Sequence, residues 1–273
     1  MRFDFDTKPN QVILYMDMLG FRNAIRENDD GTPKINAITT IFPVLEKIIR
    51  EMFCEDDDIV KFLWMSDSLM LSADISHIND LLWYMFEIQK DMLLTGLPVR
   101  GAICIGNLYH EKNIWGEALV HAVEIEETKS VYPRVLIRDE DFARLTISAE
   151  YAPYFKSDAE TPGYRYVEPI SYFFDGCLNN AMVNSNGIWA VMNVLISDIE
   201  DQYRKYCSNV SVRDKWKWLA NVCMSVFQNN EELIRKALEI DKAANMQIQT
   251  FEECMNRLNA IVRWHGHSNL VQT

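Results

Sequence analysis

Hydrophobic residues along the first two thirds of the chain follow two different periods. Short, largely apolar runs typical of strands alternate with longer segments in which apolar residues recur every three to four positions, the spacing of an amphipathic helix. Acidic, glycine-containing or proline-containing turns separate many of these segments. The pattern predicts strands at 11–18, within 59–73 (a hairpin turning near Ser66, Asp67 and Ser68), within 99–116 (a pair), at 133–139 and at 163–174, and helices at 35–53, 77–94, 117–130 and 140–147.

The order of these elements indicates one mixed domain followed by a helical region. A βαββαββαβ order, with a hairpin between the two major helices, is typical of an α+β, ferredoxin-like fold with extensions. Past Asp175 the pattern becomes almost wholly helical, over 178–207 and 212–263. We therefore predict an α+β domain at 1–176 and a helical C-terminal extension at 177–273, which packs on the first domain or on a second subunit.

Composition narrows the range of partners. The 273 residues include 40 acids and 27 bases, for a net charge of −13, which disfavours non-specific binding to nucleic acid or to an anionic membrane. No apolar run approaches the ~20 residues of a membrane helix, and the start lacks the apolar core of a signal peptide. The six cysteines are scattered without a C-x-x-C pair, which favours reduced thiols. We expect a cytoplasmic protein that binds neither nucleic acid nor membranes.

Two aspartates carry the candidate chemistry. Asp17 lies inside the apolar run 13–21, where an unpaired carboxylate is costly and needs a partner or a task. Asp67 lies at the tip of the predicted hairpin, so the two carboxylates converge if the first strand lies beside that hairpin. With the backbone carbonyl of Met18 they would bind Mg²⁺ or Mn²⁺. For each acid alone an ordinary turn residue is the better explanation, but their joint placement favours a metal site.

The turn that follows Asp17 adds a second feature. Its sequence, LGFR, contains Gly20 and Phe21, and its backbone N–H groups are suited to binding phosphate oxygens. Divalent ions beside such a turn are what a triphosphate requires.

Four segments resemble, in order, the motifs of class III nucleotidyl cyclases. They are DMLGF (17–21), MSDS (65–68, with Ser66 in place of the usual Gly), VRGAICIGNL (99–108) and NIWGEALVHAVEIEE (113–127). The resemblance covers about residues 10 to 175 and continues in VLIRDEDFARL. It implies a metal-dependent lyase with a class III cyclase domain at 1–176, two divalent ions (Mn²⁺ or Mg²⁺) held by Asp17, Met18 and Asp67, and a homodimer with active sites at the subunit interface.

Several family positions carry different residues here. Val120 stands where class III enzymes have a transition-state Asn, Glu124 where they have an Arg, and Leu63 where a Lys or Glu reads a purine. The late K-G-x-G motif is absent from 163–174. Asn113 keeps a polar group at the base-reading position, but its amide can pair with uracil or with cytosine and does not choose between them. A bulky residue at Leu63 would shorten the slot and exclude purines.

These departures leave two interpretations. One is a cyclase adapted to another base, because WGEALVHAVEIE, YPRVLI and DKWKWLAN resemble segments of the bacterial pyrimidine cyclases of the Pycsar anti-phage system. That resemblance implies conversion of UTP, favoured over CTP, to 3′,5′-cyclic UMP (or cyclic CMP) and pyrophosphate, with a separate effector protein reading the product. The other is a catalytically divergent, cyclase-like nucleotide-binding sensor or regulator. A diguanylate-type synthase ranks last, because the hairpin lacks its G-G-D/E-E-F motif.

The resemblance also suggests roles for individual residues. The missing Arg and Lys need a cationic replacement to stabilise the transition state. Arg134 is the first candidate and Arg100 the second, although an arginine at that strand start is equally well explained as a structural ion pair. We predict Asp17, Asp67 and Arg134 as catalytic residues, and Gly20, Phe21, Leu63, Arg100 and Asn113 as substrate-binding residues.

Overall fold

The structure is a computed structural model of the chain. It describes residues 7–21, 43, 59–111, 113–179, 183–243 and 248–263. The chain divides into two compact units, Met1–Tyr172 and Phe173–Thr273. The helix predicted at 35–53 lies outside the described residues, except for Pro43.

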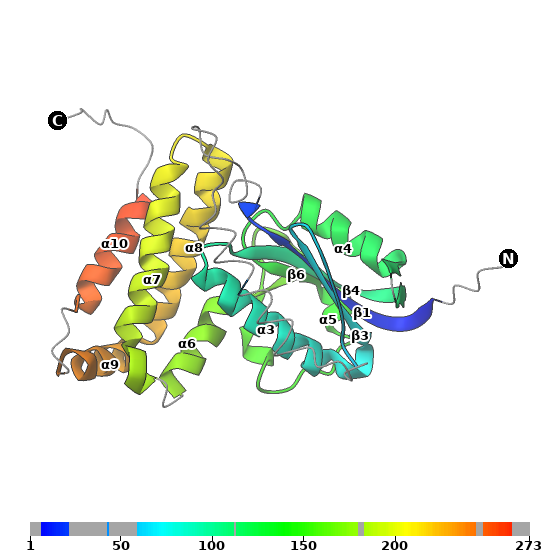
Figure 1. The fold of residues 1–273 in the computed structure, drawn as a ribbon, viewed down its shortest axis with the longest axis horizontal. Helices are drawn as coiled ribbons and strands as arrows, with labels where there is room; N and C mark the ends of the chain where they lie inside the picture. The colour runs from blue at the N-terminus through cyan, green and yellow to red at the C-terminus, as the bar shows by residue number, and fades with distance from the viewer. Residues whose placement is uncertain are drawn as a thin grey trace. The chain divides into compact units, whose positions relative to one another are not determined.

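The first unit is built on a mixed, mostly antiparallel sheet (Figure 1). Its described strands lie in the order β2–β3–β1–β4–β6–β8–β7, and β5 pairs with β4. β1 is antiparallel to both β3 and β4, whereas β6 is parallel to β4. The predicted hairpin, β2–β3, therefore lies beside the first strand. The strands are β1 (Lys8–Met18), β2 (Lys61–Met65), β3 (Ser68–Asp74), β4 (Val99–His110), β5 (Ile114–Trp115), β6 (Val135–Arg138), β7 (Phe155–Ser157) and β8 (Tyr164–Val167).

Helices connect these strands and follow them. α3 links β3 to β4, α4 links β5 to β6, and α6 crosses the boundary between the two units. The predicted α+β fold, with a mixed sheet and a helical C-terminal region, is confirmed. The helical elements are η1 (Ile75–His77), α3 (Ile78–Leu94), α4 (Glu117–Thr128), α5 (Asp139–Phe142), η2 (Ala152–Tyr154), α6 (Pro169–Asn179), α7 (Val183–Lys205), α8 (Val210–Asn229), α9 (Glu231–Ala243) and α10 (Phe251–Arg263).

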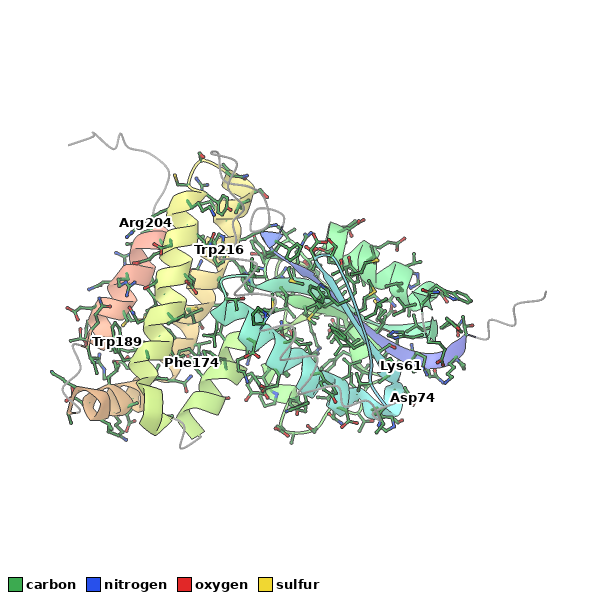
Figure 2. All side chains as sticks on the ribbon, viewed as in Figure 1. Lys61, Asp74, Phe174, Trp189, Arg204 and Trp216 are labelled. Atoms are coloured by element: carbon green, nitrogen blue, oxygen red, sulfur yellow. The ribbon has the colours of Figure 1, made fainter. Side chains whose placement is uncertain are left out.

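The second unit is helical and has its own core. Phe174 and Trp216, labelled in Figure 2, are buried, and the Phe174 ring meets that of Phe227 edge-on with their centroids 4.9 Å apart. Arg257 on α10 binds Glu200 on α7 at 2.8 Å and Ser197 at 3.0 Å, which joins the two helices. Among the described helices, none is both long and apolar enough to span a bilayer. The four cysteines whose side chains are described are free.

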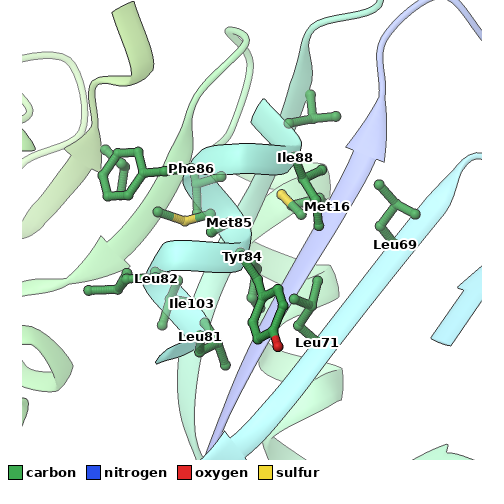
Figure 3. Packing of buried hydrophobic residues seen from close by; sticks show 14 of the residues in the cluster. Met16, Leu69, Leu71, Leu81, Leu82, Tyr84, Met85, Phe86, Ile88 and Ile103 are labelled. Carbon is green, nitrogen blue, oxygen red and sulfur yellow. The ribbon is translucent and has the colours of Figure 1, made fainter. Parts of the chain in front are cut away.

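β1 separates two hydrophobic cores by the alternation of its side chains. Successive side chains of a strand point to opposite faces of the sheet. One set of β1 residues packs with α3 in the larger core (Figure 3), and it comprises Val12, Leu14, Met16 and Met18. Ile13 and Tyr15 belong instead to a smaller core that includes Ala118 and Ala122 of α4. Asp17 follows Ile13 and Tyr15 onto this second face, which we call the α4 face.

The prediction of a strand at 163–174 is wrong beyond residue 167. β8 ends at Val167 and α6 begins at Pro169. The carboxylate of Glu168 causes this change, because it accepts hydrogen bonds from the backbone N–H groups of Ile170 at 2.7 Å and Ser171 at 3.0 Å. Proline suits the first turn of a helix, where its missing N–H has no partner to lose.

Two smaller differences concern short elements. The helix predicted at 140–147 is only one turn long and ends at Phe142, and β7, which pairs with β8, was not predicted. The other predicted elements within the described residues are confirmed to within a few residues at their ends.

We expect Glu168→Ala to lower the free energy of unfolding by roughly 1–2 kcal/mol, because both acceptors at the start of α6 are lost. Glu168→Gln keeps one acceptor and should cost less. Burial raises the pKa of Glu168, so Gln also removes a charge that the fold disfavours. Urea unfolding followed by far-UV circular dichroism measures both variants. Equal losses in the two would contradict the capping role.

Candidate functional site

The hairpin turn and the end of β1 place Asp17 and Asp67 in adjacent segments. Asp17 lies opposite Ser68 of β3 on one side and Arg100 of β4 on the other. The Met18 N–H donates to the Asp67 carbonyl oxygen at 2.8 Å, which ties the turn to β1. Ser66 has φ of +60°, the left-handed conformation that two-residue hairpin turns favour. This short connection brings together two aspartates that are 50 positions apart in the printed sequence.

Tyr15 lies on the α4 face with Asp17. Its hydroxyl and Ser68 Oγ lie 2.9 Å apart. Burial raises the pKa of Tyr15, the carboxylates of Glu126, Asp17 and Asp67 raise it further, and the hydrogen bond with Ser68 opposes them. The phenol therefore remains protonated at neutral pH, with three carboxylates around it. Sequence reasoning missed Tyr15, although its position two residues before Asp17 on a strand was a sufficient signal.

Arg100 links Asp17 to a buried acid on α4. Its Nε lies 3.4 Å from Asp17 Oδ2, and its Nη2 lies 2.6 Å from Glu126 Oε1. The side chain of Glu126 is only 4% exposed, and that of Arg100 is 22% exposed. A charge as buried as that of Glu126 needs a partner, so Arg100 has a structural task. Because Arg100 also contacts Asp17, its positive charge lies at the edge of the candidate site.

The donors at this site fit a divalent ion that shares its ligands with a substrate. Hard ions such as Mg²⁺ and Mn²⁺ take carboxylate and carbonyl oxygens, and Mg²⁺ commonly uses one or two carboxylates plus phosphate oxygens. Asp17 and Asp67 are both half-buried and supply two such carboxylates. Among the described residues, no three His, Cys, Asp or Glu side chains cluster as a metal site. Asp17 and Asp67 therefore supply two of the oxygen ligands that such an ion would need.

The turn after β1 is partly engaged by the fold itself. The Leu19 N–H donates to the Pro98 carbonyl at 3.0 Å, so this amide is used within the protein. Gly20 is exposed with φ of +86°, a conformation that glycine adopts readily, and Phe21 is buried. Of the backbone amides predicted to bind phosphate, that of Leu19 is thus excluded, and those of Gly20 and Phe21 remain. The residues after Phe21 in this turn lie outside the described part of the chain.

Arg134 is placed inside the protein. Its side chain is 2% exposed, its Nη2 lies 2.7 Å from Asp158 Oδ2, and its Nη1 donates to Asp158 Oδ1 at 3.0 Å. The rings of Tyr132 and Tyr166 lie 5.2 Å and 5.5 Å from its guanidinium carbon. The catalytic role predicted for Arg134 stays a prediction, and the buried, two-pronged ion pair gives this residue a structural explanation that the sequence did not offer.

The two predicted base-reading residues lie in different places. Leu63 is opposite Met70, which is opposite Tyr15, so the three form one row across the sheet on the α4 face. Its neighbours Phe62 and Trp64 pack against the larger core. Asn113 is exposed in the turn after β4. Because β4 runs antiparallel to β1, this turn lies at the opposite end of β1 from Asp17, about 30 Å along the strand. One protomer therefore brings Leu63 close to the two aspartates but not Asn113.

Comparison with known proteins adds a partial structural likeness. No family model and no curated protein sequence matches the chain. Two solved structures of a bacterial light-regulated adenylyl cyclase align with it at 12% identity, with TM-scores of 0.39 and 0.35. The first alignment covers 61% of this chain and 54% of the other, and the second covers 58% and 90%. The chain thus spans about half the length of the first structure, and a likeness at this level bears on neither substrate nor activity.

We expect Arg134→Met to destabilise the protein by about 3–5 kcal/mol, because it leaves Asp158 buried without its cation. Replacing both partners, as Arg134→Met with Asp158→Leu, should restore most of that loss, since no charge then remains buried. Chemical unfolding midpoints measure both proteins. A single variant as stable as the wild type would contradict the structural role and return Arg134 to the list of candidate catalytic residues.

Proposed function

We propose that this chain is a metal-dependent nucleotidyl cyclase that acts on a pyrimidine nucleoside triphosphate. The favoured reaction converts UTP, or alternatively CTP, to the 3′,5′-cyclic monophosphate and pyrophosphate. The observation that carries the proposal is the pair of half-buried carboxylates, Asp17 and Asp67, held on adjacent segments by the Met18–Asp67 hydrogen bond. The resemblance of the surrounding segments to class III cyclases supports the reaction type.

Each residue has a task in this reaction. The ribose 3′-hydroxyl gives up its proton to solvent and its oxygen bonds to the α-phosphorus. The bond from that phosphorus to the bridging oxygen breaks, and pyrophosphate leaves with the electron pair. Asp17 and Asp67 would hold two divalent ions, which when bound lower the pKa of the 3′-hydroxyl and neutralise charge on the triphosphate. Arg100, fixed by Glu126, would present its positive charge to the phosphates, and Gly20 and Phe21 would present backbone amides.

A homodimer would supply Asn113, the base-reading residue that one protomer does not bring to Asp17. Two exposed apolar side chains support such a contact: Met65 is 61% exposed beside the hairpin turn, and Val120 is 55% exposed on α4. In a two-fold dimer the same patch is used twice, so the Asn113 end of one protomer would meet the Asp17 end of its partner. We further propose that the cyclic nucleotide is a second messenger in anti-phage defence, read by a separate effector protein.

The burial of Arg134 favours a second candidate function. If Arg134 serves only the fold, the first candidate for the transition-state cation is lost, and of the two candidates only Arg100 remains. A cyclase-like protein that binds a nucleoside triphosphate without turning it over, and acts as a sensor, would have no need for that charge. Turnover separates the two functions.

We expect the purified chain, with Mn²⁺ and each of ATP, GTP, CTP and UTP in turn, to form a cyclic pyrimidine monophosphate, with UTP preferred. Asp67→Ala should lower the rate at least about 100-fold, because charge stabilisation by the metals is worth several kcal/mol. Chromatography with mass detection identifies the product. Asp80→Ala, an exposed aspartate on α3, is the matched control and should retain activity.

Other results would decide against the cyclase. Binding of UTP without product from any of the four nucleotides, by a folded chain, would support the sensor. Full activity in Asp67→Ala would contradict the proposed metal site, although the chain would still be a cyclase.

We expect partial rescue when two inactive variants are mixed. Asp17→Ala and Asn113→Ala damage opposite ends of the protomer, so each mixed dimer contains one intact site if that site is shared between subunits. Subunit exchange followed by the same product assay measures the rescue. Two inactive partners that never recover activity after verified exchange would show that each active site is contained within one protomer.

A further inference from the structure

A pocket lies at the end of the sheet where β3 and β4 finish. It has a volume of about 360 Å³, within the size range of small-molecule sites. Lys61 and Asp74, at this end of the hairpin, are both labelled in Figure 2. The polar or aromatic residues of its wall that matter here are Lys61, Ser72, Asp74, Tyr109, His110 and Glu111. None of these was singled out as a site residue from the sequence.

A buried pair of side chains forms part of this wall. Ser72 is 2% exposed, and its Oγ lies 2.5 Å from Nδ1 of His110. β1 separates β3 from β4, so the end of β4 must curve over the sheet to make this contact. The roles in this hydrogen bond depend on the tautomer of His110: when the Ser72 hydroxyl donates to Nδ1, the ring proton of a neutral His110 lies on Nε2. In that tautomer His110 presents an N–H donor.

The charge state of His110 agrees with that assignment. Burial lowers the pKa of His110 to about 4, with the positive charge of Lys61 lowering it further and Glu111 opposing both. The ring is therefore neutral throughout the physiological range. The protonation state of its ring, and hence its N–H donor, is therefore the same across this pH range, as a group that reads a base requires.

The charges around the pocket favour a polar, uncharged ligand group over a polyanion. Lys61 Nζ lies 2.9 Å from Glu111 Oε1, so these two charges neutralise each other. The wall also contains Lys8 and Asp74, one of each sign. A phosphate gains little from such a balanced field, whereas a flat heterocycle needs only placed donors and a surface to stack on. Tyr109, stacked on Trp115 at 5.4 Å, offers an aromatic surface.

Two residues of the pocket wall lie on the segments that carry the base-reading positions. Lys61 lies two residues from Leu63 on β2, hence on the same face of the sheet. The Glu111 N–H donates to the Asn113 carbonyl oxygen at 3.1 Å. The pocket thus lies at the Asn113 end of the protomer, which in the proposed dimer meets the Asp17 end of the partner, and its own residues differ from those assigned to the base by family resemblance.

We propose that His110, positioned by Ser72, reads the pyrimidine base in this pocket and selects uracil over cytosine. The proposal rests on the cyclase function above and deepens it, because Asn113 alone does not distinguish the two bases. The Nε2–H of His110 donates to the exocyclic O4 of uracil. Cytosine carries an amino group there, a donor that would face a donor. A site built around such a hydrogen bond rejects the wrong partner strongly.

The test compares kcat/KM for UTP and CTP in the full chain and in three variants. His110→Leu removes the donor and should lower kcat/KM for UTP about tenfold, the effect of one lost hydrogen bond, while CTP changes less than about threefold. His110→Gln places an amide N–H near the position of Nε2 and should stay within about threefold of the wild type. Ser72→Ala frees the tautomer of His110, so KM for UTP should rise while kcat holds. Lys236→Met, which breaks an exposed ion pair to Glu232 on α9, is the control.

Each outcome decides either the inference or the proposed function. A wild type that forms cyclic UMP, together with an unchanged UTP-to-CTP ratio in His110→Leu, overturns the inference and leaves the cyclase standing. A preference of the wild type for CTP overturns it too. If the wild type forms no product, the cyclase fails, and equilibrium binding of UTP and CTP then decides the role of His110. Tighter binding of UTP that is lost in His110→Leu and kept in His110→Gln supports that role, and equal binding rejects it.

Discussion

The period-two alternation of β1 is the constraint on which the rest of the candidate site depends. Met16 and Met18 are buried in the larger core, and that burial fixes the face on which Asp17 must lie. A shift of one residue in the pairing of β1 would exchange the two faces, moving the methionines to the α4 face and burying the carboxylate under α3. Hydrophobic packing on one face therefore holds the polar chemistry of the other face in place.

Local signals were enough to predict much of this arrangement. The apolar run around Asp17 predicted β1, and the turn at Ser66 and Asp67 predicted the hairpin. Both predictions succeeded because the period of a strand and the residue types of a turn depend on residues that are close in the sequence. The strand predicted across Pro169 failed because a single carboxylate, that of Glu168, redirects the backbone into a helix. The spacing of apolar residues can be read directly from the sequence. The hydrogen-bond or ion-pair partner of a polar side chain, in contrast, is determined by the folded structure.

Arg134 and Glu126 illustrate that second limit. From the sequence, Arg134 was predicted to be catalytic, and nothing near it in the chain indicated a structural role. Only the fold brings Asp158, 24 positions away, against its guanidinium. Glu126 on α4 was not predicted as a functional residue, yet it binds Arg100, which in turn lies next to Asp17. Long-range ion pairs leave no periodic trace in a sequence, so residues of this kind are found only when the structure is known.

The position of Asp17 on a central strand has a consequence for how the protein loses function. β1 is paired on both sides along most of its length, so its amides are protected from exchange with solvent until the surrounding sheet opens. Strands of this kind open with the cooperative unit as a whole rather than by local fraying. Asp17 therefore keeps its place for as long as the sheet around β1 stays folded. Loss of the candidate site around Asp17 in heat or denaturant should then coincide with the onset of amide exchange in β1.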